Sequence, residues 1–419
     1  MRIGYPCITR GLDGQQYKTC RKQNATEERL IELIGHNLNV LEQMIDYNHA
    51  KGIRMFRISS DIIPFGSDLE VNHLNWPKIF ADTFSRIAKK IQAYALRVSM
   101  HPGQYTVLNS PKQDVIKRAV EDLRYHCLFL DSLEVGREGK LVLHIGGLYG
   151  DKEKAMERFV ANYKELDQTI KDRLIIENDD RLFTIADVLS ISEETGAPVV
   201  YDNLHHKLNG EKLNDSDAYW IEKAIQTWSS LDGRPKVHYA QQQKGARLGA
   251  HSLTIEIEPF LTYFKKIKDF DIDIMLEVKD KNLSAIKCIL ATSDKQETSE
   301  LYKEWDCYKH LILERSPEIY SQITELLNNK DHYPVKRFYS LIEEAIQLPL
   351  DAGNLIEGLE YAWDCISQQA TAKERETTKA YKQKLAKDTN ELSKAKRYLK
   401  KLAVKYEADS LLSSYYFEL

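Results

Sequence analysis

Short β-rich runs alternate with helical stretches through most of this chain. There are eight such runs, at residues 2–5, 55–58, 96–101, 141–144, 174–177, 199–202, 236–238 and 274–278. Between them, apolar residues recur at helical spacing, for example over 27–51, 76–94, 115–134 and 152–170. Strands separated by helices pair in parallel through right-handed crossovers. Eight such units predict an α/β fold, a closed (β/α)₈ TIM barrel, with an open doubly wound sheet as the alternative.

The sequence changes character near residue 295. No β-rich run follows this point, and Ser316-Pro317-Glu318 has the pattern of a helix start with proline at the first helical position. A barrel takes roughly 250–300 residues, which leaves room for a second domain in a chain of 419. We therefore expect a TIM-barrel domain over residues 1–295 and an additional C-terminal all-helical domain over 300–419. Within the latter, residues 382–405 form a long, Lys-rich amphipathic stretch.

The composition excludes several classes of protein. None of the six cysteines forms a CxxC pair, so neither a zinc knuckle nor a disulfide framework is indicated. No apolar run approaches the ~20 residues needed to span a bilayer. The N-terminal segment lacks the zones of a signal peptide, so we expect a cytoplasmic location. We also expect a monomer without membrane contact. The net charge of −4 argues against holding nucleic acid by bulk charge, but a local basic groove or bound metal ions remain compatible with it.

Six consecutive predicted strands carry a metal-ligand residue type at their carboxyl ends. These residues are His101, His144, Glu177, Asp202, His238 and Glu277, and His205 follows Asp202 by three positions. In a barrel these ends converge on one face, and histidine and carboxylate are the usual ligands of Zn²⁺ and Mn²⁺. A lone histidine after a strand is more often a hydrogen-bonded structural residue. Here four of the twelve histidines stand in register with three carboxylates, which predicts a site for several divalent ions, with Glu177 as the candidate bridge.

Clustered divalent ions suit phosphodiester hydrolysis. One ion lowers the pKa of a bound water, and the others hold the attacked phosphate and the leaving oxygen. The sequence offers no Ser/His/Asp arrangement and no Gly-rich phosphate loop, and Gly146-Gly147 indicates only a turn.

Several segments around these residues resemble the UV damage endonuclease family. They are Arg57-Ile58-Ser59-Ser60, His101-Pro102-Gly103-Gln104-Tyr105, Leu143-His144-Ile145-Gly146-Gly147, Glu177-Asn178-Asp179-Asp180, Asp202-Asn203-Leu204-His205-His206, Pro235-Lys236-Val237-His238 and Leu276-Glu277-Val278-Lys279. The resemblance covers residues 1–290 and implies a TIM barrel related to endonuclease IV. It implies a DNA repair enzyme that nicks UV-damaged double-stranded DNA immediately 5′ of pyrimidine dimers and (6-4) photoproducts.

The resemblance also implies roles for individual residues. It implies a divalent metal cluster, Mn²⁺ with Zn²⁺ or Mg²⁺ as alternatives, whose ligands are His101, His144, Glu177, Asp202, His205, His238, His251 and Glu277. Asp68 stands where the family usually has a histidine, and either replaces that ligand or leaves the site one ligand short.

Other matched positions concern catalysis and DNA. Lys236 matches a lysine that is carboxylated in the family, and with Glu177 and His238 it is a catalytic candidate. Gln104 and Tyr105 match residues that wedge into the duplex opposite the lesion. Tyr5 matches a residue that faces the flipped bases.

Two other functional classes stay open. One is a different enzyme on a related metal-binding barrel, either an abasic-site endonuclease or a sugar isomerase. The other is a non-catalytic DNA-binding or scaffold protein with a structural metal site. Gln104 and Tyr105 favour a DNA substrate over a free sugar.

The helical tail carries its own alternatives. Residues 311–320 and 354–363 resemble a helical domain of unknown function found on other bacterial proteins. The cationic residues of the tail either grip a duplex or form a solvated helix face, and we favour the solvated face. They are Lys394, Lys396, Arg397, Lys400, Lys401 and Lys405.

Overall fold

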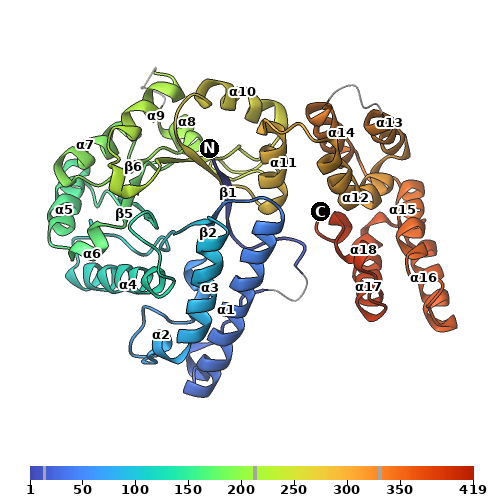
Figure 1. Ribbon diagram of the computed structural model, residues 1–419, viewed down its shortest axis with the longest axis horizontal. Coiled ribbons are helices and arrows are strands. Elements are labelled where there is room, and N and C mark those ends of the chain that lie inside the picture. The colour runs from blue at the N-terminus through green and yellow to red at the C-terminus, as the bar shows by residue number, and fades with distance from the viewer. Residues whose placement is uncertain (13–15, 211–214, 329–332) are drawn as a thin grey trace. The chain divides into compact units, whose positions relative to one another are not determined.

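A computed structural model describes residues 1–12, 16–210, 215–328 and 333–419 (Figure 1). The chain divides into two compact units. The first comprises Met1–Thr9, Gly14–Ile255 and Tyr263–Ile286, and the second comprises Arg10–Asp13, Glu256–Thr262 and Lys287–Leu419.

The first unit is built on one parallel sheet. Its described residues form eight strands: β1 (Ile3–Cys7), β2 (Met55–Ile58), β3 (Arg97–Met100), β4 (Leu141–His144), β5 (Leu174–Glu177), β6 (Val199–Val200), β7 (Lys236–Tyr239) and β8 (Asp273–Leu276). They pair in the order β6-β5-β4-β3-β2-β1-β8-β7. A parallel bridge between Asp202 and His238 joins the two outer strands, and His238 N–H donates to the Tyr201 carbonyl (2.9 Å). The sheet therefore closes on itself, and the predicted TIM barrel is confirmed.

Side chains complete the pairing of β6, which has only two residues. The Val199 N–H at its start donates to the Thr227 hydroxyl (2.8 Å). Just after the strand, the Asn203 amide accepts from the Ala240 N–H (2.8 Å) and donates to the Ala240 carbonyl (3.1 Å). The seam between β6 and β7 is therefore held together by both backbone and side-chain hydrogen bonds.

Helices follow the strands and surround them (Figure 1). They are α1 (Glu27–Ala50), α2 (Trp76–Ile79), α3 (Ala81–Ala93), α4 (Gln113–Ser132), α5 (Lys152–Lys164), α6 (Gln168–Lys171), α7 (Ile185–Thr195), α8 (Asn203–Asn209), α9 (Asp217–Ile225), α10 (Ile257–Ile267) and α11 (Asn282–Thr292), with the short 3₁₀ helices η1 (Lys22–Asn24), η2 (Ser60–Ile62) and η3 (Ser230–Asp232). The helical periodicity over 76–94 and 152–170 runs through two breaks, at Phe80 and at Asp167, whose backbones leave the helical region.

Polar pairs cross the interior of the barrel. They are Arg97 with Asp273 (Nη1–Oδ2, 2.9 Å), Lys236 with Ser99 (Nζ–Oγ, 3.1 Å) and Arg57 with Glu277 (Nη2–Oε2, 3.3 Å). Two of these pairs join strands that are not neighbours in the sheet, and the third joins Arg57 of β2 to Glu277, which directly follows the non-neighbouring strand β8. These side chains therefore face inward. Because side chains alternate along a strand, the inward face of β3 that carries Arg97 and Ser99 next delivers His101 at the strand end.

The described residues beyond 295 form helices and loops without strands. The helices are α12 (Thr298–Arg315), α13 (Pro317–Asn328), α14 (Val335–Gln347), α15 (Ala352–Asp364), α16 (Ala372–Leu385), α17 (Leu392–Lys405) and α18 (Asp409–Leu412), with η4 (Thr389–Glu391) and η5 (Tyr415–Phe417). Pro317 begins α13 as predicted, and the Ser316 hydroxyl accepts from the Ile319 N–H (3.1 Å). No described helix has the length and apolar character that a bilayer crossing requires.

Two details of the helical region depart from a simple pattern. The Lys-rich stretch 382–405 is not one helix, because the Asp388 carboxylate accepts from the Asn390 N–H (2.9 Å) and starts a new turn between α16 and α17. Helices α12 and α15 approach closely, since a Cβ on Gly358 would lie 2.6 Å from the Glu314 Cα.

Candidate metal centre

The predicted strand-end residues gather at one end of the barrel. His144 and Glu177 are the last residues of β4 and β5 and are register partners. His101 directly follows β3, Glu277 directly follows β8, and His238 lies in β7. The parallel register of the barrel therefore brings these side chains together on the face where TIM-barrel sites lie.

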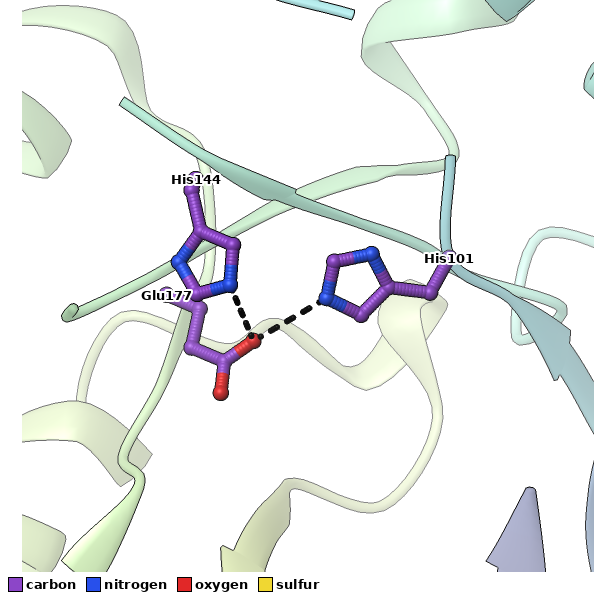
Figure 2. A group of neighbouring side chains, drawn as sticks. All are labelled: His101, His144 and Glu177. Atoms are coloured by element: carbon purple, nitrogen blue, oxygen red, sulfur yellow. Dashed lines mark ion pairs between the residues drawn. The ribbon is translucent and has the colours of Figure 1, made fainter. Parts of the chain in front are cut away.

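Glu177 is at the centre of this group and is buried. One carboxylate oxygen lies 3.4 Å from His101 Nε2 and 3.6 Å from His144 Nε2, and Figure 2 shows both imidazoles pointing toward it. Its other oxygen lies 2.8 Å from His238 Nδ1 and 3.6 Å from His205 Nδ1. The two oxygens of Glu177 thus face different histidines, an arrangement suited to a carboxylate that bridges two ions.

Asp202 and His205 enter the site through the start of α8. Asp202 caps this helix, accepting from the His205 N–H (2.8 Å). The Asn178 side chain accepts from the Asp202 N–H (2.9 Å), and the Asn178 carbonyl accepts from His205 Nδ1 (2.9 Å). This last bond places the proton on Nδ1 and leaves Nε2 of His205 as a potential metal ligand.

Glu277 and His251 complete the group. Glu277 Oε1 lies 3.6 Å from His238 Nδ1, and its other oxygen lies 3.9 Å from His251 Nδ1. The guanidinium of buried Arg57 forms an ion pair with both Glu277 oxygens. Every predicted ligand except Asp68 is therefore linked, through Glu177, Asp202 or Glu277, into one cluster.

Burial and neighbouring charges set the protonation of these groups. Burial raises the pKa of Asp202 to about 7, and it lowers the pKa of His144 to about 4 although Glu177 opposes the shift. Burial alone would raise the pKa of Glu177, but His238 and His144 hold it well below its usual range. Burial also disfavours charge on His205, yet the Asp202 and Glu177 carboxylates outweigh it and raise its pKa to about 9.

Divalent metal ions fit the donor set. Two triplets of ligand atoms, one from His101, His144 and Glu177 and one from Glu177, Asp202 and His238, each lie within 4.8 Å of one another. His238 Nε2 and Asp202 Oδ2 are buried, and neither has a hydrogen-bond partner among the residues that the structure describes. A buried polar atom without a partner is costly, and coordination to a cation removes that cost.

The remaining predicted residues lie in varied surroundings. The Asp68 carboxylate pairs with Lys22 (3.2 Å) and is joined to no cluster residue by any contact among the described residues. Tyr5 is fully buried, and its hydroxyl bonds Thr9 (2.5 Å) and Asn48 (2.7 Å), so in this structure it presents no surface to a ligand.

Gln104 and Tyr105 form the tip of the loop after β3. Tyr105 is 83% exposed. The loop beneath it is anchored, since Thr106 donates its N–H to the Gly103 carbonyl (2.9 Å) and its hydroxyl to Asp122 (2.6 Å). These two side chains are therefore held out from the protein by a fixed turn.

Lys236 lies deeper in the barrel than the cluster. Its side-chain Nζ donates to the Ser99 hydroxyl, and burial holds the pKa of Lys236 well below its usual range. The sequence pattern singles out Lys236 but assigns no role to Arg57 or Asn178. A charged residue in the middle of an apolar strand was the available signal for Arg57, whereas the bonds of Asn178 depend on the folded loops.

Comparisons with known proteins agree with this geometry. The chain matches the family model described as UV-endonuclease UvdE over residues 3–304 and a protein of unknown function, DUF1722, over 309–419. It is 38% identical to the UV DNA damage endonuclease of Clostridium perfringens (strain 13 / Type A) over 421 residues, which covers 99% of each chain. It is 34% identical to that of Bacillus cereus (strain B4264) over 278 residues, 65% of this chain and 86% of the relative.

A solved structure gives the same result. The crystal structure of SacUVDE matches with a TM-score of 0.65 at 37% identity, over 69% of this chain and 96% of that one. Since the family model spans most of the chain and the Clostridium perfringens relative matches along its whole length, the chain belongs to the UV-endonuclease UvdE family.

Proposed function

We propose that this protein is a metal-dependent DNA repair endonuclease that nicks the damaged strand immediately 5′ of UV photoproducts. Family membership supports a DNA repair endonuclease. One observation carries the metal dependence: the Glu177 carboxylate lies 2.8–3.6 Å from imidazole nitrogens of four histidines. The proposed metal is Mn²⁺, with Zn²⁺ and Mg²⁺ to be compared.

The proposed reaction is hydrolysis of one phosphodiester bond. The residues around Glu177 would hold divalent ions, which when bound would supply positive charge to the phosphate and acidify a water molecule. The water oxygen bonds to phosphorus, the bond from phosphorus to the 3′-oxygen breaks, and a water proton ends on that oxygen. The products are a 3′-hydroxyl and a 5′-phosphate. Asn178 contributes by bonding the backbone N–H and carbonyl of Asp202, and Arg57 contributes by holding the Glu277 carboxylate in place.

Lys236 is proposed to be carboxylated. Only an unprotonated amine adds to carbon dioxide, and burial favours that form of Lys236. The carbamate would replace a buried neutral amine with an anionic ligand or base beneath the cluster. Protein equilibrated with ¹³C-bicarbonate should give one carbamate carbon signal that is lost in Lys236→Met. A spectrum without that signal in the unsubstituted protein contradicts the modification.

Gln104 and Tyr105 are proposed to fill the space opposite an extruded lesion. A photoproduct pairs and stacks poorly, so extruding it costs only a few kcal/mol. An exposed aromatic ring on an anchored turn can stack in the vacated gap, and an amide can bond to the orphaned bases.

Strand cleavage on a defined duplex tests the proposal. A duplex with a single photoproduct, labelled at either end, should be cut immediately 5′ of the lesion with Mn²⁺, and an undamaged duplex should stay intact. Glu177→Ala should reduce cutting by at least a thousand-fold, by analogy with loss of a central catalytic group. Glu194→Ala, an exposed glutamate of α7, serves as the matched control.

Other outcomes identify the alternatives. Cutting of an abasic duplex alone would indicate an abasic-site endonuclease, and turnover of a ketose or aldose would indicate a sugar isomerase. Unchanged function in Glu177→Ala would indicate a structural metal site.

A further inference from the structure

The tip of a hairpin on the barrel face that carries the site has no role in the proposed reaction. It spans residues 241–253, leaves the end of β7, and has the predicted ligand His251 near its base. Gln242 and His251 form an antiparallel bridge, and Gln243 N–H donates to the Ala250 carbonyl (2.7 Å). We call this segment the 241–253 hairpin.

Side chains hold the 241–253 hairpin in one shape. The Gln242 amide donates to the Arg247 carbonyl (2.9 Å) and accepts from the Gly249 N–H (2.8 Å), bonding both sides of the tip. Gly249 has a φ of +79°, and a Cβ there would lie 2.6 Å from Asp180 Oδ2, so the hairpin packs against the loop after β5. At its base, Lys279 N–H donates to the Ser252 carbonyl (3.1 Å). The hairpin is therefore an anchored projection.

The tip of the 241–253 hairpin exposes an apolar side chain beside a cation. Leu248 is 72% exposed, and Arg247 and Lys244 are exposed near it. When a partner covers an exposed apolar side chain, apolar surface leaves water and the free energy of the complex falls. Flanking cations favour a partner with negative charge, such as a phosphate backbone.

The closed strand order gives the position of this hairpin. In the ring β1 to β8, the strands β3 and β7 are four places apart in either direction. The Gln104–Tyr105 turn follows β3 and the 241–253 hairpin follows β7, so they emerge from opposite sides of the barrel mouth. The cluster around Glu177 lies between them.

We propose that the 241–253 hairpin is a second DNA-probing element, in which Leu248 inserts beside the damaged base step from the side opposite Gln104 and Tyr105. Apolar side chains inserted at a base step unstack and kink a duplex. Arg247 binds a backbone phosphate and positions the tip. This inference rests on the proposed function, because a UV-damaged duplex is the partner.

The test measures stacking and binding in the full-length protein. A 2-aminopurine placed beside the photoproduct becomes brighter when it is unstacked, and fluorescence anisotropy gives the affinity. Leu248→Ala should lose most of the brightening and bind the damaged duplex roughly ten-fold more weakly, with undamaged duplex bound as before. Leu248→Met should restore both signals, since it keeps an apolar side chain of similar volume.

Two further variants separate the roles of the tip. Leu231→Ala is the matched control, because Leu231 is 65% exposed but precedes β7, at the other end of the same strand. It should behave as the unsubstituted protein. Arg247→Gln should weaken damaged and undamaged duplex alike and reduce the salt dependence of binding by about one phosphate contact.

The outcomes distinguish this inference from the proposed function. If the unsubstituted protein cuts the damaged duplex and Leu248→Ala matches it in unstacking and affinity, the hairpin inference is overturned and the proposed function stands. If the unsubstituted protein cuts no damaged duplex with any of the three metals, both are overturned.

Discussion

The buried side chain of Arg57 orients a candidate metal ligand, Glu277, that follows a different strand. Its guanidinium pairs with both oxygens of Glu277, across the barrel interior. Burial alone would raise the pKa of Glu277, but Arg57 and His238 hold it below its usual range. The pair therefore keeps Glu277 ionised and fixes its orientation before any ligand arrives.

Removing Arg57 should weaken metal binding without unfolding the barrel. We expect Arg57→Met to lower Mn²⁺ affinity by roughly 10–100-fold, the usual cost of losing a partner that orients a metal ligand. Titration of free Mn²⁺ by electron paramagnetic resonance measures this directly. Arg54→Met, which precedes the same strand and bonds the Tyr94 carbonyl instead, should bind as the unsubstituted protein does. Equal affinities in the two variants would contradict an orienting role.

The clustering of the candidate ligands at the strand ends could be predicted from the sequence, because the carboxyl ends of all strands in a parallel barrel lie on the same face. His144 and Glu177, at the ends of the neighbouring strands β4 and β5, are register partners. Loop and core side chains were less predictable. Asp68 turns toward Lys22, and Tyr5 is held by Asn48, a residue of α1 far along the chain. Such choices depend on partners that only the folded chain brings together.

At the scale of elements, a buried ion pair ties two loops at the barrel end remote from the cluster. Lys140, just before β4, donates to Asp232 of η3 (2.5 Å) and to the Asp172 carbonyl (2.7 Å). Burial opposes the charge on Asp232, but bonds from Lys140 and Ser229 lower its pKa to about 2. Residues at this end of a TIM barrel serve stability.

Asp232→Asn should therefore destabilise the protein and spare its cutting rate. We expect a loss of about 3 kcal/mol at pH 7, because Lys140 is left buried without its carboxylate partner. A carboxyl group with a lowered pKa stabilises the folded protein at pH values above its ordinary pKa near 4, and this stabilisation is lost as the pH falls toward 2. The difference in stability between the variant and the unsubstituted protein should therefore shrink below about pH 4. Urea denaturation across this pH range measures it. The control Asp271→Asn breaks an exposed pair with Arg234 and should cost at most about 1 kcal/mol.

The close contact of α12 and α15 makes Gly358 sensitive to a single methyl group. Gly358→Ala should lower the stability of the helical region by about 1–3 kcal/mol, because the added Cβ meets the Glu314 backbone. Thermal unfolding followed by circular dichroism measures the change. Glu357→Ala, at the exposed neighbouring position, should change little. Intrinsic propensity alone would make Gly358→Ala stabilising, so a raised melting temperature would contradict the packing argument.

For the whole molecule, the second unit is not a simple C-terminal appendage. It includes residues 256–262 and the chain from 287 onward. Within it, Glu343 of α14 accepts from the Ile257 N–H (3.0 Å) and pairs with buried Lys287 (2.8 Å). A chain that ends near residue 295 would lose Glu343 from both groups, so experiments on the tail need the full-length protein.

The cationic tail should not add to DNA affinity. Four of its six named residues already pair within the described structure, Lys394 with Glu391, Lys396 with Glu314, Lys400 with Glu418 and Lys405 with Glu374. We therefore expect the double variant Arg397→Gln, Lys401→Gln to bind duplex DNA with an unchanged salt dependence. Fluorescence anisotropy from 50 to about 200 mM salt tests this. A slope reduced by about two contacts would favour the alternative, a duplex grip.

The seam between β6 and β7 has a consequence for hydrogen exchange. Its backbone bridge joins Asp202 to His238, and the His238 N–H bond to Tyr201 lies across it. Both bridged residues belong to the cluster, so a cation bound there adds its binding free energy to the closed seam. The His238 amide should exchange its hydrogen more slowly as metal is added, while an amide of the long β1–β2 ladder keeps its rate. The barrel's own backbone would then report whether its site is filled.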